Sequence, residues 1–206
     1  PMHHLRILTG LTKVWRNSIL PKLPEILELR TVAQSRLFTI ESMKLRFSNG
    51  VERLYERLPK RGREAVIVVA INQKNELILI REYLAGFHKY ELNLPKGTVD
   101  PGESYEEAAN RELKEEAGFG AKKLDYLREI TLAPGHMGFS LHVILARELF
   151  SESLPGDEPE PMEVEQYPFE EADDLVSSVL ISESRSIAAI KIAEVFLSRE
   201  SKNSRV

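Results

Sequence analysis

The chain has 206 residues, which fits one ordinary domain with a small additional unit. Its formal net charge of -4 argues against a protein that binds nucleic acid through a broadly basic surface. It contains no cysteine, which excludes disulfides and thiolate chemistry and fits a reducing compartment, so we expect a cytoplasmic protein. No run of residues approaches the ~20 apolar residues of a membrane-spanning helix.

Residues 1–24 differ in composition from the rest of the chain. Leu8, Leu11, Trp15 and Ile19 follow helical spacing among basic residues, which indicates a basic amphipathic helix. Such a helix can lie on a membrane surface or on a partner. The sequence favours the plainer alternatives, an extension without fixed structure or a helix that packs on its own domain.

Residues 25–60 are predicted to form a small β unit. The sequence alternates over residues 37–47, and Asn49-Gly50 is the strongest short signal for a hairpin turn. Residues 51–58 would then return antiparallel to the first strand. A lone hairpin is marginal in water, so this unit needs either the main domain or another subunit to pack on.

Residues 61–206 are predicted to form the main domain. Strands are expected at residues 65–71, 77–80, 90–95, 123–132, 139–149 and 164–169, and helices at residues 105–117, 170–177 and 184–199. The first two strands are almost entirely apolar, as strands buried on both faces are. Many strands with one helix between them and helices at the end indicate an α/β fold in which helices cover a mixed sheet.

The helix expected at residues 105–117 carries clear end signals. Ser104 followed by Glu107 is a capping box, which gives partners to the backbone N–H groups at the helix start. Gly118 stands where a helix end often requires left-handed backbone geometry.

The same helix carries a crowded acidic turn. Glu112, Glu115 and Glu116 are spaced i, i+3 and i+4, so their carboxylates project to one side and repel one another. A divalent cation turns this repulsion into attraction, and Mg²⁺ takes oxygen ligands that it shares with substrate phosphates. Arg111 lies one turn before Glu115 and can pair with it. The alternative is a solvated acidic face, which is what most charge runs are.

The stretch from residue 97 to residue 119 resembles the sequence box of the Nudix hydrolase family. The box consists of Gly97, five residues, Glu103, seven residues, Arg111-Glu112-Leu113, one residue, Glu115-Glu116, one residue and Gly118-Phe119. Every defined position is filled. The resemblance implies an α/β/α sandwich with a mixed sheet, and hydrolysis of a nucleoside diphosphate linked to another group.

The resemblance also implies a metal site. Glu112 and Glu116 would be the principal ligands of Mg²⁺ or Mn²⁺, with Glu115 as a further ligand and a main-chain carbonyl near Lys96 or Gly97 completing the site.

Catalytic roles follow from the same likeness. Arg111 would pair with Glu103 or Glu115 and orient them. In the ADP-ribose-pyrophosphatase branch of the family, the base is often a glutamate on a later loop. The acidic, proline-rich residues 151–163 favour Glu160 for this role, while Glu158, Glu163 and a merely solvated acidic loop stay open.

Further segments resemble the branch of the family that hydrolyses ADP-linked compounds. These are residues 36–42, 45–50, 63–66, 78–83, 118–121 and 156–161. The branch implies substrates such as ADP-ribose, NADH and diadenosine polyphosphates, release of AMP, and a homodimer formed through the N-terminal unit. Arg81 is expected near the diphosphate, and Glu82 and Lys96 are further candidates for substrate contacts.

Two other functions remain alternatives. One is a Nudix enzyme that acts on nucleoside triphosphates or RNA 5′ ends, although an RNA substrate would favour a basic surface. The other is a Nudix protein that binds nucleotides without catalysis. Such proteins usually lose carboxylates of the box, and this chain keeps Glu103, Glu112, Glu115 and Glu116.

Overall fold

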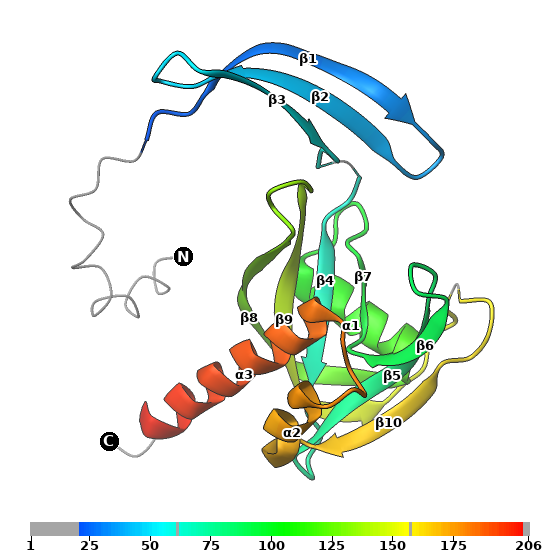
Figure 1. The fold of residues 1–206 in the computed structure, drawn as a ribbon. Coiled ribbons are helices and arrows are strands. Elements are labelled where there is room, and N and C mark those ends of the chain that lie inside the picture. The colour runs from blue at the N-terminus through cyan, green and yellow to red at the C-terminus, as the bar shows by residue number, and fades with distance from the viewer. Residues whose placement is uncertain (1–20, 61, 157, 204–206) are drawn as a thin grey trace. The chain divides into compact units, whose positions relative to one another are not determined.

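The computed structural model describes residues 21–60, 62–156 and 158–203. The chain divides into two units, Pro1–Leu58 and Pro59–Val206 (Figure 1). The helix predicted for residues 1–24 falls almost wholly outside the described residues. No described helix is both long enough and apolar enough to cross a membrane.

The first unit contains an antiparallel sheet of three strands in the order β1-β2-β3. Its strands are β1 (Glu25–Gln34), β2 (Thr39–Arg46) and β3 (Glu52–Arg57). The turn predicted at Asn49-Gly50 joins β2 to β3, with Gly50 at a φ of 81° and its N–H donating to the Phe47 carbonyl over 2.9 Å. The hairpin is therefore confirmed, but it has a third strand that the sequence prediction did not include.

Strand β1 was missed for a physical reason. Its pairing with β2 shifts register between Ile26 and Glu28 and again between Thr31 and Ala33. Each such irregularity inserts an extra residue and breaks the two-residue alternation by which a strand is recognised in sequence.

The second unit contains a four-stranded sheet in the order β7-β4-β9-β8 and a three-stranded sheet in the order β10-β5-β6. The strands are β4 (Ala65–Ala70), β5 (Glu76–Leu84), β6 (Lys89–Asn93), β7 (Lys96–Thr98), β8 (Phe119–Leu132), β9 (Phe139–Ser151) and β10 (Glu163–Pro168). Strands β4 and β9 are parallel and the other pairs are antiparallel, so the predicted mixed sheet is confirmed.

The helices of this unit are α1 (Tyr105–Ala117), α2 (Ala172–Ser177) and α3 (Ser184–Asn203), and a short 3₁₀ turn, η1 (Phe169–Glu171), precedes α2. Helix α1 has the predicted bounds. The helix predicted at residues 170–177 is divided between η1 and α2, and α3 extends past the predicted end at residue 199. Strand β7 was not predicted, because three residues are too few to show a period.

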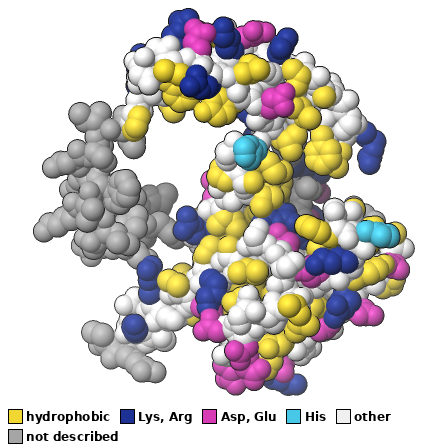
Figure 2. All heavy atoms as spheres, viewed as in Figure 1, with side chains coloured by type: hydrophobic (Ala, Val, Ile, Leu, Met, Phe, Trp, Pro, Cys, Tyr) yellow, Lys and Arg dark blue, Asp and Glu magenta, His cyan; other side chains and the backbone are white. Residues whose placement is uncertain are grey.

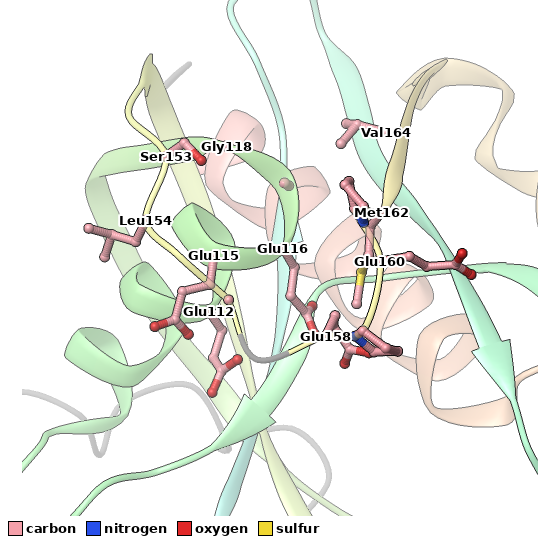
Figure 3. A pocket seen from close by; sticks show the side chains of 14 residues that line it. Glu112, Glu115, Glu116, Gly118, Ser153, Leu154, Glu158, Glu160, Met162 and Val164 are labelled. Carbon is pink, nitrogen blue, oxygen red and sulfur yellow. The ribbon is translucent and has the colours of Figure 1, made fainter.

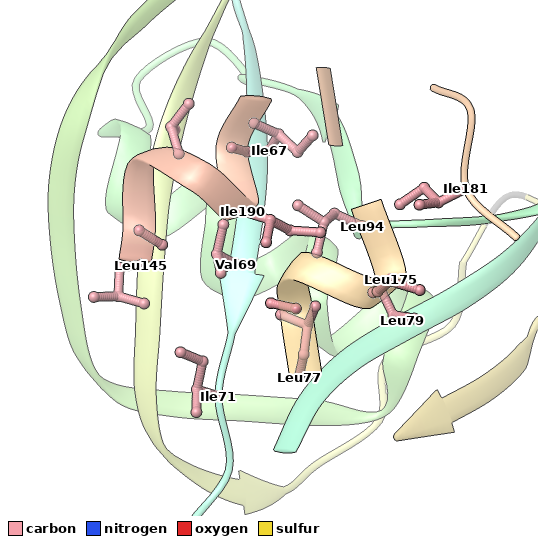
Figure 4. Packing of buried hydrophobic residues seen from close by; sticks show 14 of the residues in the cluster. Ile67, Val69, Ile71, Leu77, Leu79, Leu94, Leu145, Leu175, Ile181 and Ile190 are labelled. Carbon is pink, nitrogen blue, oxygen red and sulfur yellow. The ribbon is translucent and has the colours of Figure 1, made fainter. Parts of the chain in front are cut away.

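The core forms two layers on opposite faces of the sheets. Ile67 and Val69 of β4 pack in one cluster with Leu175 of α2 and Ile190 of α3, all fully or almost fully buried (Figure 4). Alternate residues of β4 pack in a second cluster with α1, which contributes Leu113 among others. Because β4 is apolar on both sides, helices cover both faces, which gives an α/β/α sandwich with α1 on its own side.

Candidate active site

Helix α1 is fixed at both ends by contacts that the sequence predicted. The Ser104 hydroxyl accepts a hydrogen bond from the Glu107 N–H at 3.2 Å, and the Glu107 carboxylate accepts one from the Ser104 N–H at 2.8 Å. At the other end, Gly118 adopts a φ of 72° and its N–H donates to the Leu113 carbonyl. These caps determine where the helix begins and ends, and therefore which side chains project from its exposed face.

Arg111 connects the acidic side chains of the helix to the loop before it. Its Nε donates to Glu103 at 2.9 Å, and its Nη1 donates to both Glu112 at 2.8 Å and Glu115 at 2.9 Å. Its Nη2 donates to the Thr98 carbonyl at 2.7 Å. The hydrogen bonds to Arg111 hold the pKa of the Glu103 carboxyl below its usual range. One guanidinium thus neutralises part of the crowded turn and positions three of the carboxylates singled out in the sequence.

Glu116 has different partners from Glu112 and Glu115. Its carboxylate accepts a hydrogen bond from the Lys96 backbone N–H at 2.8 Å. The pKa of Glu116 is raised to about 8, chiefly by burial; the hydrogen bond from the Lys96 backbone and the Lys96 charge oppose the shift, and the carboxylates of Glu112 and Glu82 contribute to it. A buried carboxylate with acidic neighbours is costly unless a cation compensates it.

Gly97 lets the backbone of β7 approach the helix closely. A Cβ atom at this position would lie 2.1 Å from Cδ of Glu112, a distance that real side chains do not tolerate. The strand that carries Lys96 and Gly97 therefore runs directly against the carboxylates of Glu112 and Glu116. A side chain at this position would displace the Glu112 carboxyl group, so the glycine serves close approach and not backbone conformation, since its φ is not positive.

The donor set fits a hard divalent cation. Carboxylate oxygens of Glu112, Glu115 and Glu116, with backbone carbonyls of β7 beside them, are the ligand type that Mg²⁺ and Mn²⁺ prefer. Within the described residues, no group of three or more His, Asp or Glu side chains is already arranged around a common metal position. Arg111 lies between Glu112 and Glu115, so metal binding there would require these side chains to rearrange.

A cavity of about 490 Å³ lies beside these carboxylates. Glu112, Glu115 and Glu116 line it from α1, and Glu158 and Glu160 line it from the acidic loop (Figure 3). Two of the three predicted loop glutamates, Glu158 and Glu160, thus line the same cavity as the carboxylates of α1. Glu163 does not line this cavity but begins β10, directly opposite Arg81 of β5.

The Glu160 carboxylate is engaged elsewhere. It accepts a hydrogen bond from the Tyr90 hydroxyl, and in Figure 3 it points away from α1. Tyr90 is a contact that sequence reasoning missed, because it depends on how the acidic loop crosses the β5–β6 hairpin and leaves no motif.

A second cavity of about 380 Å³ lies near the three residues predicted to contact substrate, Arg81, Glu82 and Lys96. Arg81 and Glu82 line it, together with Tyr83, Tyr90 and residues 158–163 of the loop. Arg81 pairs with Glu165 and, at 3.4 Å, with Glu163. Lys96 pairs with Glu82, and the Lys96 side chain is only 11% exposed. Its ammonium group is therefore largely shielded from solvent. Both cavities share residues 158–162, which makes them neighbours.

Comparisons with known proteins agree with this architecture. Residues 61–185 match the NUDIX domain, and residues 24–57 match the NudE-type Nudix hydrolase N-terminal domain. The chain is 48% identical over 174 residues to the ADP compounds hydrolase NudE of Escherichia coli strain K12, covering 84% of this chain and 93% of that protein. It is 30% identical over 178 residues to an ADP-ribose pyrophosphatase of Bacillus subtilis strain 168, covering 82% and 94%.

A solved structure shows the same fold. The crystal structure of an ADP compounds hydrolase superposes with a TM-score of 0.83 at 46% sequence identity, covering 87% of this chain and 97% of the other. Nudix hydrolases generally use divalent cations, which fits the oxygen-rich cavity beside α1. The chain therefore belongs to the Nudix hydrolase family and is a pyrophosphohydrolase with a NudE-type N-terminal domain.

Proposed function

We propose that the protein is a metal-dependent pyrophosphohydrolase that cleaves the diphosphate linkage of ADP-linked compounds and releases AMP. The observation that carries this proposal is the cavity in which the carboxylates of α1 face the acidic loop. The names of the relatives from Escherichia coli and Bacillus subtilis support the substrate class. ADP-ribose, NADH and diadenosine polyphosphates are the specific substrates that we propose.

Glu112 and Glu116 would hold Mg²⁺ or Mn²⁺, with Glu115 and the Gly97 carbonyl completing the set of ligands. When bound, the cation neutralises diphosphate oxygens and lowers the pKa of a coordinated water. Arg111 would orient Glu103 through the hydrogen bond described above, and its hydrogen bonds to Glu112 and Glu115 would rearrange when these carboxylates bind the cation. Arg81 would bind the diphosphate, because a guanidinium matches phosphate oxygens well and its present partners are surface carboxylates. Glu82 would fix the Lys96 ammonium beside the bound anion.

A glutamate of the acidic loop would accept the proton of the attacking water. The family resemblance favours Glu160, which must first release the Tyr90 hydroxyl to turn toward the metal site. Glu158 lines the same cavity and is the alternative. Comparing kcat for Glu158→Gln and Glu160→Gln assigns the base, since only its removal should lower kcat by about 100-fold or more.

We propose that residues 61–206 perform the hydrolysis and that the β unit of residues 25–60 forms a homodimer, with residues 1–24 as an extension. Leu29, Met43 and Tyr55 are neighbours across the three strands, and Leu29 and Tyr55 are 48% and 44% exposed. Figure 2 shows further hydrophobic side chains on the surface of this unit.

Apolar surface of this kind is typical of interfaces. Light scattering should give a dimer for the wild-type protein and a smaller mass for Leu29→Lys, and an unchanged mass would argue against this interface.

The cysteine-free sequence supports a cytoplasmic protein.

Substrate profiling tests the proposed activity. The purified protein is incubated with Mg²⁺ or Mn²⁺ and, separately, ADP-ribose, NADH, diadenosine triphosphate, a nucleoside triphosphate and 5′-triphosphate RNA. We expect AMP from the three ADP-linked compounds, slow turnover of the other two, and no turnover after chelation of the metal. Fast turnover of the triphosphate or the RNA would instead identify a different Nudix activity. Binding of nucleotide without any turnover would identify a non-catalytic protein.

A further inference from the structure

Two tyrosines that line the second cavity lie side by side. Tyr83 of β5 and Tyr90 of β6 are directly opposite in the antiparallel pair, and their ring centroids lie 5.5 Å apart at an interplanar angle of 58°. Cross-strand aromatic pairs stabilise hairpins by burying their rings against each other. Here, however, Tyr83 is 46% exposed and Tyr90 is 54% exposed, so much of the ring surface remains open to solvent.

The hydroxyl groups of both tyrosines are already occupied. The Tyr83 hydroxyl lies 2.8 Å from Nδ1 of His88, whose ring meets that of Tyr83 edge-on at 5.9 Å. The Tyr90 hydroxyl donates to Glu160. Each hydroxyl thus has a partner within the protein, and the part of each tyrosine that offers a ligand apolar surface is the aromatic ring.

The tyrosine pair adjoins groups that suit a phosphate. Arg81 precedes Tyr83 by two residues in the same strand, so the two side chains leave the strand on the same side. Both tyrosines and Arg81 line the 380 Å³ cavity, which shares residues 158–162 with the cavity of the α1 carboxylates. The Arg81 guanidinium and the two partly exposed tyrosine rings therefore lie in one cavity, next to the α1 carboxylates that suit a metal ion.

We infer that Tyr83 and Tyr90 form a stacking subsite for the planar heteroaromatic ring of a nucleotide half of the substrate. This inference rests on the proposed function and extends it. It proposes where a ring of the substrate binds, which the carboxylates of α1 do not determine. The ring is either the adenine of the ADP portion or the second ring of a two-ringed substrate such as a dinucleotide. Both rings have the flat π-face that stacks on aromatic side chains.

Direct binding of three phosphate probes tests the inference without requiring catalysis. AMP carries adenine, nicotinamide mononucleotide carries the nicotinamide ring, and ribose 5-phosphate carries no ring. Calorimetry gives Kd for each probe with the wild-type protein and with Tyr83→Leu/Tyr90→Leu. Because stacking contributes about 1–3 kcal/mol per ring, we expect Kd of at least one ringed probe to rise about tenfold, while Kd of ribose 5-phosphate stays unchanged. The probe that weakens identifies the ring.

Two further variants make the test specific. Tyr90→Phe keeps the ring but removes the hydroxyl that binds Glu160, so it should retain the wild-type Kd for the ringed probe. Phe87→Leu removes an aromatic ring from the same hairpin that is 80% exposed and does not line the cavity, and it should change no Kd. Equal Kd values in the wild-type protein and the double variant would overturn the inference, as would equal weakening of all three probes. Failure of the wild-type protein to hydrolyse ADP-linked compounds would instead overturn the proposed function.

Discussion

Replacing Gly97 by alanine should disturb the proposed metal site through a single methyl group. The new Cβ would lie 2.1 Å from Cδ of Glu112, and non-bonded carbon atoms rarely come closer than about 3.0 Å, so the carboxyl group must move by about 1 Å. A displacement of this size in an active site can lower the rate by about 100-fold, which corresponds to about 2.7 kcal/mol of transition-state stabilisation. We therefore expect kcat/KM to fall by this factor and more metal to be needed for half-maximal activity.

The assay measures ADP-ribose hydrolysis over a range of Mn²⁺ concentrations, with direct Mn²⁺ binding measured in parallel. Gly135→Ala is the matched control, because a Cβ at that position would meet no atom within 4 Å and the residue does not have a positive φ. Similar melting temperatures for the two variants would show that the loss is local. If Gly97→Ala kept the wild-type kcat/KM and metal dependence, the reasoning that places Glu112 in the metal site would be refuted.

Further predictions concern the box helix and a distant ion pair. Glu116→Gln should abolish metal-dependent turnover without lowering the melting temperature, and wild-type activity in this variant would remove Glu116 from the ligands. Ser104→Ala should lower the free energy of unfolding by about 1 kcal/mol in urea titrations, since it removes the N-terminal cap of α1. Arg147→Met should lower it by about 2 kcal/mol at neutral pH while kcat is kept, because Arg147 donates to Asp125 at 2.6 Å and to Glu200.

Hydrogen bonds that Arg147 donates to Glu200 lower the pKa of the Glu200 carboxyl in the folded state. The stabilisation is therefore present above the unfolded pKa of about 4.3 and is lost as the pH falls through the lower folded value. The difference between wild type and Arg147→Met should accordingly shrink in acid, and a difference that grew there would contradict the assignment.

The parts of the fold that could be predicted are those specified by local chemistry. Helix α1 has the predicted ends because Ser104, Glu107 and Gly118 each satisfy backbone groups within one turn of the chain. The central strand β4 was found because its residues are apolar without interruption. Strand β1 was missed because two irregularities break its alternation, and β7 was missed because its three residues take their extended form from pairing with β4.

The same distinction applies to the site. The spacing of Glu112, Glu115 and Glu116 fixes their common direction, since all three belong to one helix. The contacts of Arg111 with Glu103 and Thr98 depend in addition on how the loop returns to the helix, so the sequence left its choice of partners open.

The proposed substrate contacts outside the Nudix box depend on pairings between different segments of the chain. Tyr83 meets Tyr90 only because β5 and β6 pair in one register, and a shift by one residue would send the two rings to opposite faces. Glu160 reaches Tyr90 only because β10 pairs with β5 and brings the acidic loop back across the hairpin. Metal chemistry can thus be conveyed by a short motif on one helix. The proposed stacking subsite requires three strands in correct register, so no short motif in the sequence specifies it.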